Sequence, residues 1–241
     1  MSRQVALADI RIGALRRIDQ ESAGYFSESE INDLANQSIA EWYEVQIGWG
    51  NELYLDSAPI NLAAPVAGTT DTFVLPPTFF RLRGVDANIS GQSFDLVPFN
   101  FNDRNIYKQY PSWTLGKLAA YRIMGNNGSQ GPTNGVKYIK FIPAPGGTTS
   151  ATVWFYPNSP QLGGDAESVD GSAGWEEYII LMTAAKMLIR QQRDPSTLLS
   201  LAGSEMTRIM SSAAKLDAAH PEHVSITRRW GARNLRRAFI R

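Results

Sequence analysis

The chain changes its hydrophobic periodicity twice, and this change constrains the fold more than any other feature. Near both ends, apolar residues recur at three- and four-residue steps, whereas the long middle has short aromatic and β-branched runs separated by proline and glycine. The first spacing places apolar side chains on one face of a helix, and the second is typical of strands and turns. The sequence therefore predicts an α+β protein in which helices from both ends accompany a β-rich middle.

Local signals set the expected helix boundaries. Residues 5–48 are predicted to be helical, and Ser27 followed by Glu30 has the form of a capping box that starts a helix over 28–47. A strongly apolar helix is predicted to follow Gly174-Trp175. Asp194-Pro195 then has the form of an N-cap followed by proline in the first helical position, which predicts one more helix that Pro221 ends.

The middle of the chain is predicted to hold six strands and one short helix. The strand segments are Thr70–Leu75, Phe79–Ile89, Phe94–Val97, Ala119–Met124, Val136–Ile142 and Thr149–Tyr156, and the short helix lies near Asp103–Gln109. The simplest assembly is a helical bundle from the N- and C-terminal helices, with an inserted antiparallel β-rich module and an extended C-terminal arm. The predicted parts are residues 1–50, 51–170, 171–220 and 221–241.

Charge is unevenly distributed along the chain. Residues 228–241 hold six arginines and no acid; removing these six from the 23 basic residues leaves 17 against 23 acidic ones, a net of −6. An acidic body argues against a DNA-gripping surface, because phosphate binding needs clustered cations. With no cysteine, neither a disulfide nor a thiolate metal site is possible. No signal peptide or membrane span is expected, so a soluble protein assembled in a reducing cytoplasm is predicted.

Several local phrases occur in an order that resembles a known family. The phrases are Arg16-Arg-Ile-Asp19, Phe26-Ser-Glu-Ser-Glu-Ile-Asn-Asp33, Thr72-Phe-Val-Leu-Pro76, Phe79-Phe-Arg-Leu-Arg-Gly-Val85, Pro98-Phe-Asn-Phe-Asn-Asp-Arg104, Phe141-Ile-Pro-Ala-Pro145, Val153-Trp-Phe-Tyr-Pro157 and Gly174-Trp-Glu-Glu-Tyr178. Together they span roughly residues 5–220, and their number and order carry the likeness. The chain resembles the head-to-tail adaptor, or connector, proteins of tailed bacteriophages, especially the short-tailed type.

This resemblance implies a structural virion protein of the phage neck. It implies a homo-oligomeric ring, expected to be a dodecamer, that joins the portal protein to a tail tube or nozzle protein. Double-stranded DNA would pass through the ring during genome packaging and ejection without sequence-specific contacts. The resemblance also implies that the C-terminal segment reaches the portal.

The C-terminal arm supplies the candidate binding residues. They are Arg228, Arg229, Trp230, Arg233, Leu235, Arg236, Arg237, Phe239 and Arg241. Arginine offers a rigid fork of donors to carboxylates, and the aromatic rings offer area to bury in a groove of a partner. Docking on the portal, contact with DNA phosphate and a solvated tail all remain possible; the interleaved aromatic residues favour docking.

No constellation with the form of a catalytic, metal or cofactor site is present, so no enzyme and no cofactor are predicted. His220 and His223 are separated by a helix-breaking proline, unlike the two histidines of a zinc helix. The glycines at 125, 128, 131 and 135 do not open a helix and are not expected to cradle phosphate. Glu28/Glu30 and Glu176-Glu177 are explained by capping and by the helix dipole.

Two alternatives belong to other classes. In the first, the β region is a carbohydrate-binding or tail accessory module, because its aromatic residues could form a sugar-binding platform. These residues are Phe99, Phe101, Tyr107, Tyr110 and Trp113. The same set could instead form a packed core or a subunit interface. The arginine-rich end could instead make the chain a DNA-binding protein.

Overall fold

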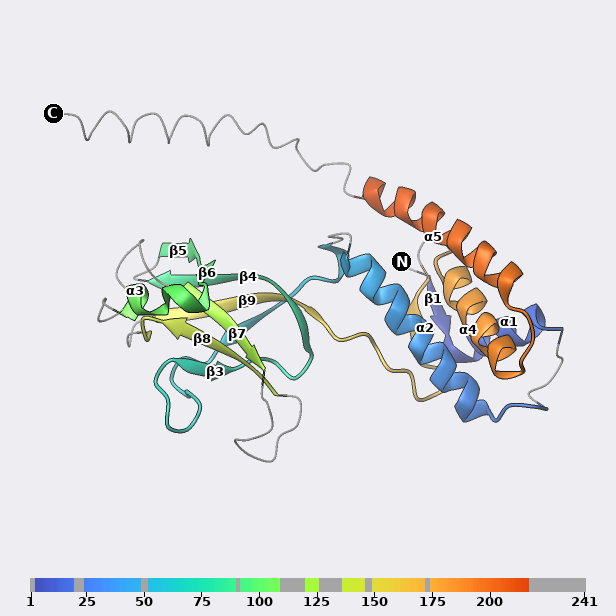
Figure 1. Cartoon of the computed structure of the whole chain (residues 1–241), viewed down its shortest axis with the longest axis horizontal. Helices are drawn as coiled ribbons and strands as arrows, with labels where there is room; N and C mark the ends of the chain where they lie inside the picture. The colour runs from blue at the N-terminus through green and yellow to red at the C-terminus, as the bar shows by residue number, and fades with distance from the viewer. Residues whose placement is uncertain are drawn as a thin grey trace. The chain divides into compact units, whose positions relative to one another are not determined.

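The computed structural model describes residues 3–19, 24–48, 52–89, 92–108, 120–125, 136–145, 149–171 and 174–216. The protein is a mixed α+β fold, as predicted. It divides into two compact units (Figure 1). The described residues of Met1–Ala35 and Asp165–Arg241 form the first, here called the helical unit, and those of Asn36–Gly164 form the second, the β-rich unit. The division falls inside helix α2 (Glu28–Gly48).

The helical unit is built on helix α4 (Glu176–Arg190), which packs against both α1 (Leu7–Arg17) and α5 (Ser196–Leu216). Its apolar stripes are the ones that the periodicity predicted. In α1 the fully buried side chains follow helical spacing, and α5 buries a single stripe. Burial of these stripes holds the unit together, because isolated helices of this length are marginal in water. The buried residues are Leu7, Ile10 and Ala14 in α1, and Leu198, Ala202 and Ile209 in α5.

Both predicted helix starts are confirmed by their hydrogen bonds. The backbone N–H of Glu30 donates to Ser27 Oγ at 3.3 Å, and the Ser27 N–H donates to Glu30 Oε2 at 3.0 Å, which is a capping box. At α5 the Ser196 N–H donates to Asp194 Oδ1 at 2.9 Å, as expected of an aspartate cap.

A small two-stranded sheet in the helical unit was not predicted. β1 (Gln4–Ala6) pairs antiparallel with β10 (Ser168–Asp170), so the prediction that helix begins at residue 5 was wrong. A three-residue strand has no visible periodicity, and its partner lies about 160 residues away. A Cβ at Gly171 would come within 2.4 Å of Val5 Cγ2, so this pairing needs glycine beside it.

The β-rich unit contains two four-stranded sheets. Their strands are β2 (Asp56–Ile60), β3 (Thr72–Val74), β4 (Phe79–Ile89), β5 (Gln92–Asp95), β6 (Val97–Pro98), β7 (Ala120–Gly125), β8 (Lys137–Ile142) and β9 (Thr149–Pro157). The strand orders are β2-β9-β4-β5 and β3-β8-β7-β6. The pairs are antiparallel, as predicted, except that of β6 with β7, which is parallel and was not expected.

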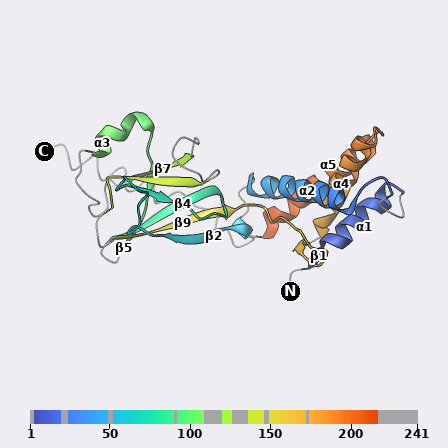
Figure 2. The ribbon, with the colours of Figure 1, turned by 90° about the horizontal axis from the view of Figure 1, so that it is seen from below.

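The core of the β-rich unit lies between the two sheets. One cluster of buried side chains draws on both sheets, so they pack face to face, and Figure 2 shows the β7 layer above the layer of β4, β9 and β2. Alternate residues of β9 point into this core, namely Ala151, Val153 and Phe155. β2 was not predicted because its sequence contains a proline and few β-branched residues. An edge strand tolerates proline, and β2 lies at the edge of its sheet.

Three short helical segments complete the β-rich unit, apart from its part of α2. The 3-10 turn η1 (Glu52–Tyr54) precedes β2, and the 3-10 turn η2 (Phe101–Asp103) leads directly into α3 (Arg104–Lys108). The short helix predicted near Asp103–Gln109 is therefore confirmed. Phe101 of η2 and Ile106 of α3 are exposed, whereas Arg104 between them is half-buried.

Candidate interaction surfaces

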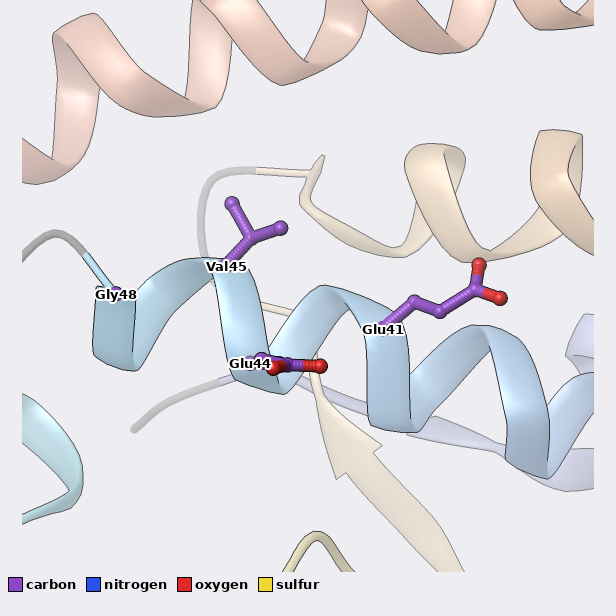
Figure 3. A pocket seen from close by; sticks show the side chains of 4 residues that line it. All are labelled: Glu41, Glu44, Val45 and Gly48. Carbon is purple, nitrogen blue, oxygen red and sulfur yellow. The ribbon is translucent and has the colours of Figure 1, made fainter. Parts of the chain in front are cut away.

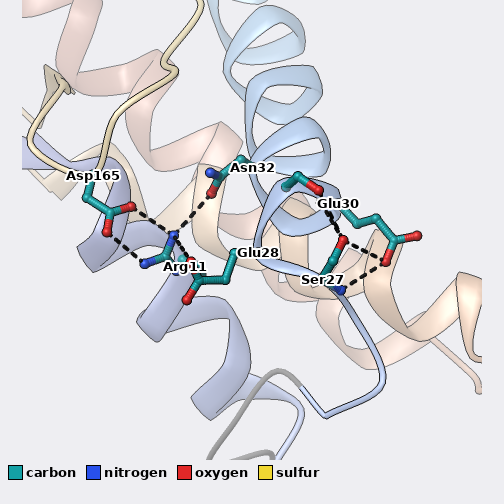
Figure 4. A network of polar contacts seen from close by, with 7 residues as sticks. Arg11, Ser27, Glu28, Glu30, Asn32 and Asp165 are labelled. Atoms are coloured by element: carbon teal, nitrogen blue, oxygen red, sulfur yellow. Dashed lines mark hydrogen bonds and ion pairs between the residues drawn. The ribbon is translucent and has the colours of Figure 1, made fainter.

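Arg11 lies at the centre of a polar network in the helical unit (Figure 4). Its guanidinium donates to both carboxylate oxygens of Asp165, at 2.9 and 3.2 Å, and lies 3.9 Å from Glu28. A further contact of 3.5 Å reaches Asn32. Its hydrogen bond with Asp165 raises the pKa of Arg11 further, so the cation is permanent. The network ties α1 to the start of α2 and to the segment before β10, and these carboxylates therefore have a structural role.

The capping glutamate of α2 also has a structural role. Glu30 receives hydrogen bonds from the backbone and the hydroxyl of Ser27, and Arg190 lies 2.7 Å from its other oxygen. The two hydrogen bonds from Ser27 lower the pKa of Glu30, and Arg190 adds to the effect. A carboxylate held in its charged form by a cap and an arginine is unsuited to proton transfer at neutral pH. The structural explanation of the Glu28/Glu30 pair stands.

The two glutamates at the start of α4 are each held by an arginine from the N-terminal segment. Arg3 pairs with Glu176 at 2.9 Å, and Arg17 pairs with Glu177. Burial raises the pKa of Glu177, and the charge of Arg17 opposes this shift. Both acids therefore fix the start of α4 to the N-terminal segment, in addition to the favourable helix-dipole position that the sequence indicated.

Several predicted features lie outside the described residues. These are the docking-arm residues Arg228, Arg229, Trp230, Arg233, Leu235, Arg236, Arg237, Phe239 and Arg241, together with His220, Pro221, His223 and the glycines at 128 and 131 and 135. Among the residues that the structure describes, no cluster of three or more acids and histidines could hold a metal ion. No helix within the same described ranges is long and apolar enough to cross a membrane.

The described members of the aromatic set of the β region lie in different environments. Phe99 is buried with Ala120 and Ile142, whereas Phe101 two residues later is 57% exposed. The side chain of Tyr107, and Tyr110 and Trp113 altogether, lie outside the described residues. Of the two rings that are described, one belongs to the core and one to the surface.

Phe101 forms the centre of an exposed basic and apolar surface, here called the Phe101 patch. Arg104 stacks over the Phe101 ring at 4.1 Å and donates to its carbonyl oxygen at 2.8 Å, while Arg122 of β7 lies 5.5 Å from the same ring. Neither guanidinium forms an ion pair with a carboxylate in the described part of the chain. Val97 and Ile106 of the flanking segments are also more than half exposed. The patch combines two guanidinium groups with exposed apolar area.

A second surface of opposite charge lies along the C-terminal half of α2. Glu41 and Glu44 project from it one turn apart, beside Val45 and Gly48 (Figure 3). Glu44 also borders a hollow of 360 Å³, here called the Glu44 hollow, which is lined by Ala40, Tyr43, Glu44, Phe80, Asn158, Ser159 and Gln161. No ion pair of Glu44 occurs among the described residues.

The Glu44 hollow combines groups that suit a cationic side chain. The Phe80 ring is 39% exposed, and the neighbouring Tyr43 is buried. Burial raises the pKa of Tyr43 to about 12, so its hydroxyl stays neutral. A carboxylate, an exposed aromatic ring and two amide side chains in one hollow can bind a guanidinium by ion pairing, stacking and hydrogen bonding.

Four residues of these two surfaces were not predicted from the sequence to be binding residues, namely Arg104, Arg122, Glu44 and Phe80. Phe101 and Arg104 stand three positions apart, which is a usable signal for a ring and a cation on one helical turn. Arg122 lies near the Phe101 ring because β6 pairs with β7 in parallel, and no local sequence pattern predicts this pairing. Glu44 and Phe80 meet only after folding.

No protein-family model matches the chain, and no curated protein matches it.

Proposed function

We propose that this chain is a structural, non-enzymatic protein of a tailed-phage virion, a head-to-tail adaptor that forms a ring between portal and tail. The observation that carries the proposal is the arrangement of the chain: segments from both ends build one helical unit, and the intervening chain builds a separate β-rich unit. The order of helical, β-rich and helical segments is the one that the resemblance to phage adaptors implies. Double-stranded DNA would pass through the ring.

The finer architecture belongs to the same proposal. The helices of the two chain ends would form the bundle that builds the ring body, and residues 221–241 would form an arm that reaches the portal. The arginines and aromatic residues of that arm suit an acidic, grooved partner surface. Apart from these arginines the chain carries a net charge of −6, which suits a passage through which DNA slides without adhering.

The distribution of charged side chains also supports a binding role over catalysis. The carboxylates at the starts of α2 and α4 are used in caps and ion pairs. In the β-rich unit, the Phe101 patch and the Glu44 hollow instead lie at the surface. Open surfaces with unused charges suit contact with other protein chains.

The proposal is tested by measuring mass. Light scattering or native mass spectrometry of the purified chain mixed with purified portal rings is expected to show about one copy per portal subunit. A variant that lacks residues 222–241 should remain folded by circular dichroism and fail to join the portal. Absence of association at every salt concentration would refute the adaptor role. Glycan binding, or salt-dependent DNA affinity that is lost with residues 228–241, would then favour one of the other two classes.

A further inference from the structure

A closed ring of identical subunits needs two different, complementary surfaces on each copy, because each subunit meets its neighbours head to tail. The β-rich unit carries two surfaces of opposite charge, the Phe101 patch and the Glu44 hollow. We propose that the Phe101 patch of one copy docks on the Glu44 hollow of the next copy. This inference rests on the proposed ring, and it names the contact that closes the ring.

The Phe101 patch has the donors for such a contact. Arg104 donates one N–H to the Phe101 carbonyl oxygen, and its guanidinium carbon lies over the ring, 4.1 Å from the centroid. These two contacts restrict the side chain, so less side-chain entropy is lost when its remaining N–H groups meet a carboxylate. The exposed rings and aliphatic groups of Phe101 and Ile106 add apolar area around these charges.

The Glu44 hollow has the matching acceptors. Glu44 is exposed, and Asn158 and Gln161, whose side chains carry amide oxygens, line the same hollow. Lys137, whose ammonium group lies 5.8 Å from the centroid of the Phe80 ring, donates to the carbonyl oxygens of Phe79 and Phe80, at 3.0 and 3.4 Å. Lys137 therefore satisfies backbone acceptors and leaves Glu44 available to an arginine from outside.

Self-complementarity favours a second copy over other occupants. Among the described residues, neither Glu44 of the hollow nor Arg104 and Arg122 of the patch forms an ion pair, and both surfaces belong to one unit of the same chain. Two other occupants are separable by experiment: the arginine-rich segment 228–241 could fill the hollow, and an acidic segment of a different protein could cover the patch.

Disulfide trapping tests the contact directly, because the chain has no cysteine. Ile106→Cys and Gln161→Cys are prepared as separate proteins, mixed, and oxidised with copper phenanthroline. A disulfide-linked dimer is expected in the mixture and in neither protein alone. Val74→Cys, at an exposed residue of β3, replaces Ile106→Cys as the matched control and should give no dimer with Gln161→Cys. A mixture that yields no more dimer than the control overturns the proposal.

Charge exchange tests the chemistry of the contact. Arg104→Glu with Arg122→Glu, or Glu44→Arg alone, should each weaken self-association by roughly tenfold or more, since like charges then face each other. All three changes in one chain should restore most of the association. Failure of the triple variant to recover, with its circular dichroism unchanged, would refute the pairing.

Two further results separate this inference from the proposed function. Deleting residues 222–241 should leave the trapped dimer unchanged; its loss would identify the arm as the occupant and refute the contact between patch and hollow. If portal association survives in variants that give no trapped dimer, the ring closes through other surfaces and the adaptor role stands. If trapping succeeds and portal association fails, the contact stands and the adaptor role does not.

Discussion

The two units of the protein use their charges in different ways. In the helical unit, arginines far apart in sequence meet carboxylates, as in the pairs Arg3–Glu176, Arg11–Asp165 and Arg17–Glu177. In the β-rich unit, Arg104 and Arg122 instead stack on an exposed phenylalanine, and Glu44 borders an open hollow. The helical unit thus uses these charges to hold itself together. The β-rich unit also forms ion pairs, Arg83–Glu52 and Lys140–Asp71, but its Arg104, Arg122 and Glu44 form none among the described residues.

The difference follows from how each unit forms its core. Helices bury one stripe each and leave polar flanks side by side, so ion pairs form where the flanks meet. The sandwich buries apolar side chains between two hydrogen-bonded sheets, and needs few ion pairs for its cohesion. Unpaired charges at its surface are then the groups most open to interaction with another chain.

The substitution with the largest expected effect tests whether the helical unit can unfold while the β-rich unit stays folded. Ile10 is fully buried in α1, so Ile10→Asp should destabilise the helical unit by more than about 4 kcal/mol, because it buries an unpaired charge. Ile12→Asp, two residues away at a 44% exposed position, is the matched control and should cost less than about 1 kcal/mol. Thermal unfolding followed by circular dichroism measures both. Limited proteolysis should still find the β-rich unit resistant in Ile10→Asp; its loss would show that the two units unfold together.

A somewhat smaller effect is expected in the sandwich core. Phe141 is fully buried and lies 5.7 Å from the Phe73 ring, so Phe141→Ala should cost about 3–5 kcal/mol by leaving a cavity. Val74 on the neighbouring strand β3 is 54% exposed, and Val74→Ala should cost less than about 1 kcal/mol. Urea denaturation gives both values. Equal costs for the two variants would contradict the position of the core between the sheets.

The smallest expected effect concerns pH and the cap of α2. Because its pKa is lowered in the folded protein, Glu30 contributes stability above its unfolded pKa of 4.5, and this contribution is lost as the pH falls through the folded value. Glu30→Gln should therefore be less stable than the natural chain at neutral pH, and the difference should shrink in acid. Unfolding midpoints measured from neutral pH to about pH 3 test this expectation. A difference that is the same at every pH would mean that the charge of Glu30 has no part in the cap.

Much of the fold could be predicted because its signals are local. The Ser27/Glu30 box and the Asp194 cap depend on residues two or three positions apart, and both formed as expected. The strand over Phe79–Ile89 was predicted from its aromatic and β-branched residues, and β4 spans the same residues. Little of the candidate surfaces could be predicted in this way, because Glu44 and Phe80 are brought into one hollow by folding.

The sequence by itself determined where α2 and α5 begin, which helix faces are apolar, and where most strands lie. These properties depend on hydrogen bonds and packing within a few residues along the chain. Only the tertiary structure decided that β1 pairs with β10, that β6 runs parallel to β7, and which arginine meets which carboxylate. Such contacts join residues as far apart as Arg11 and Asp165, separated by 154 positions. Their formation depends on how the whole chain closes around its cores, which no local pattern encodes.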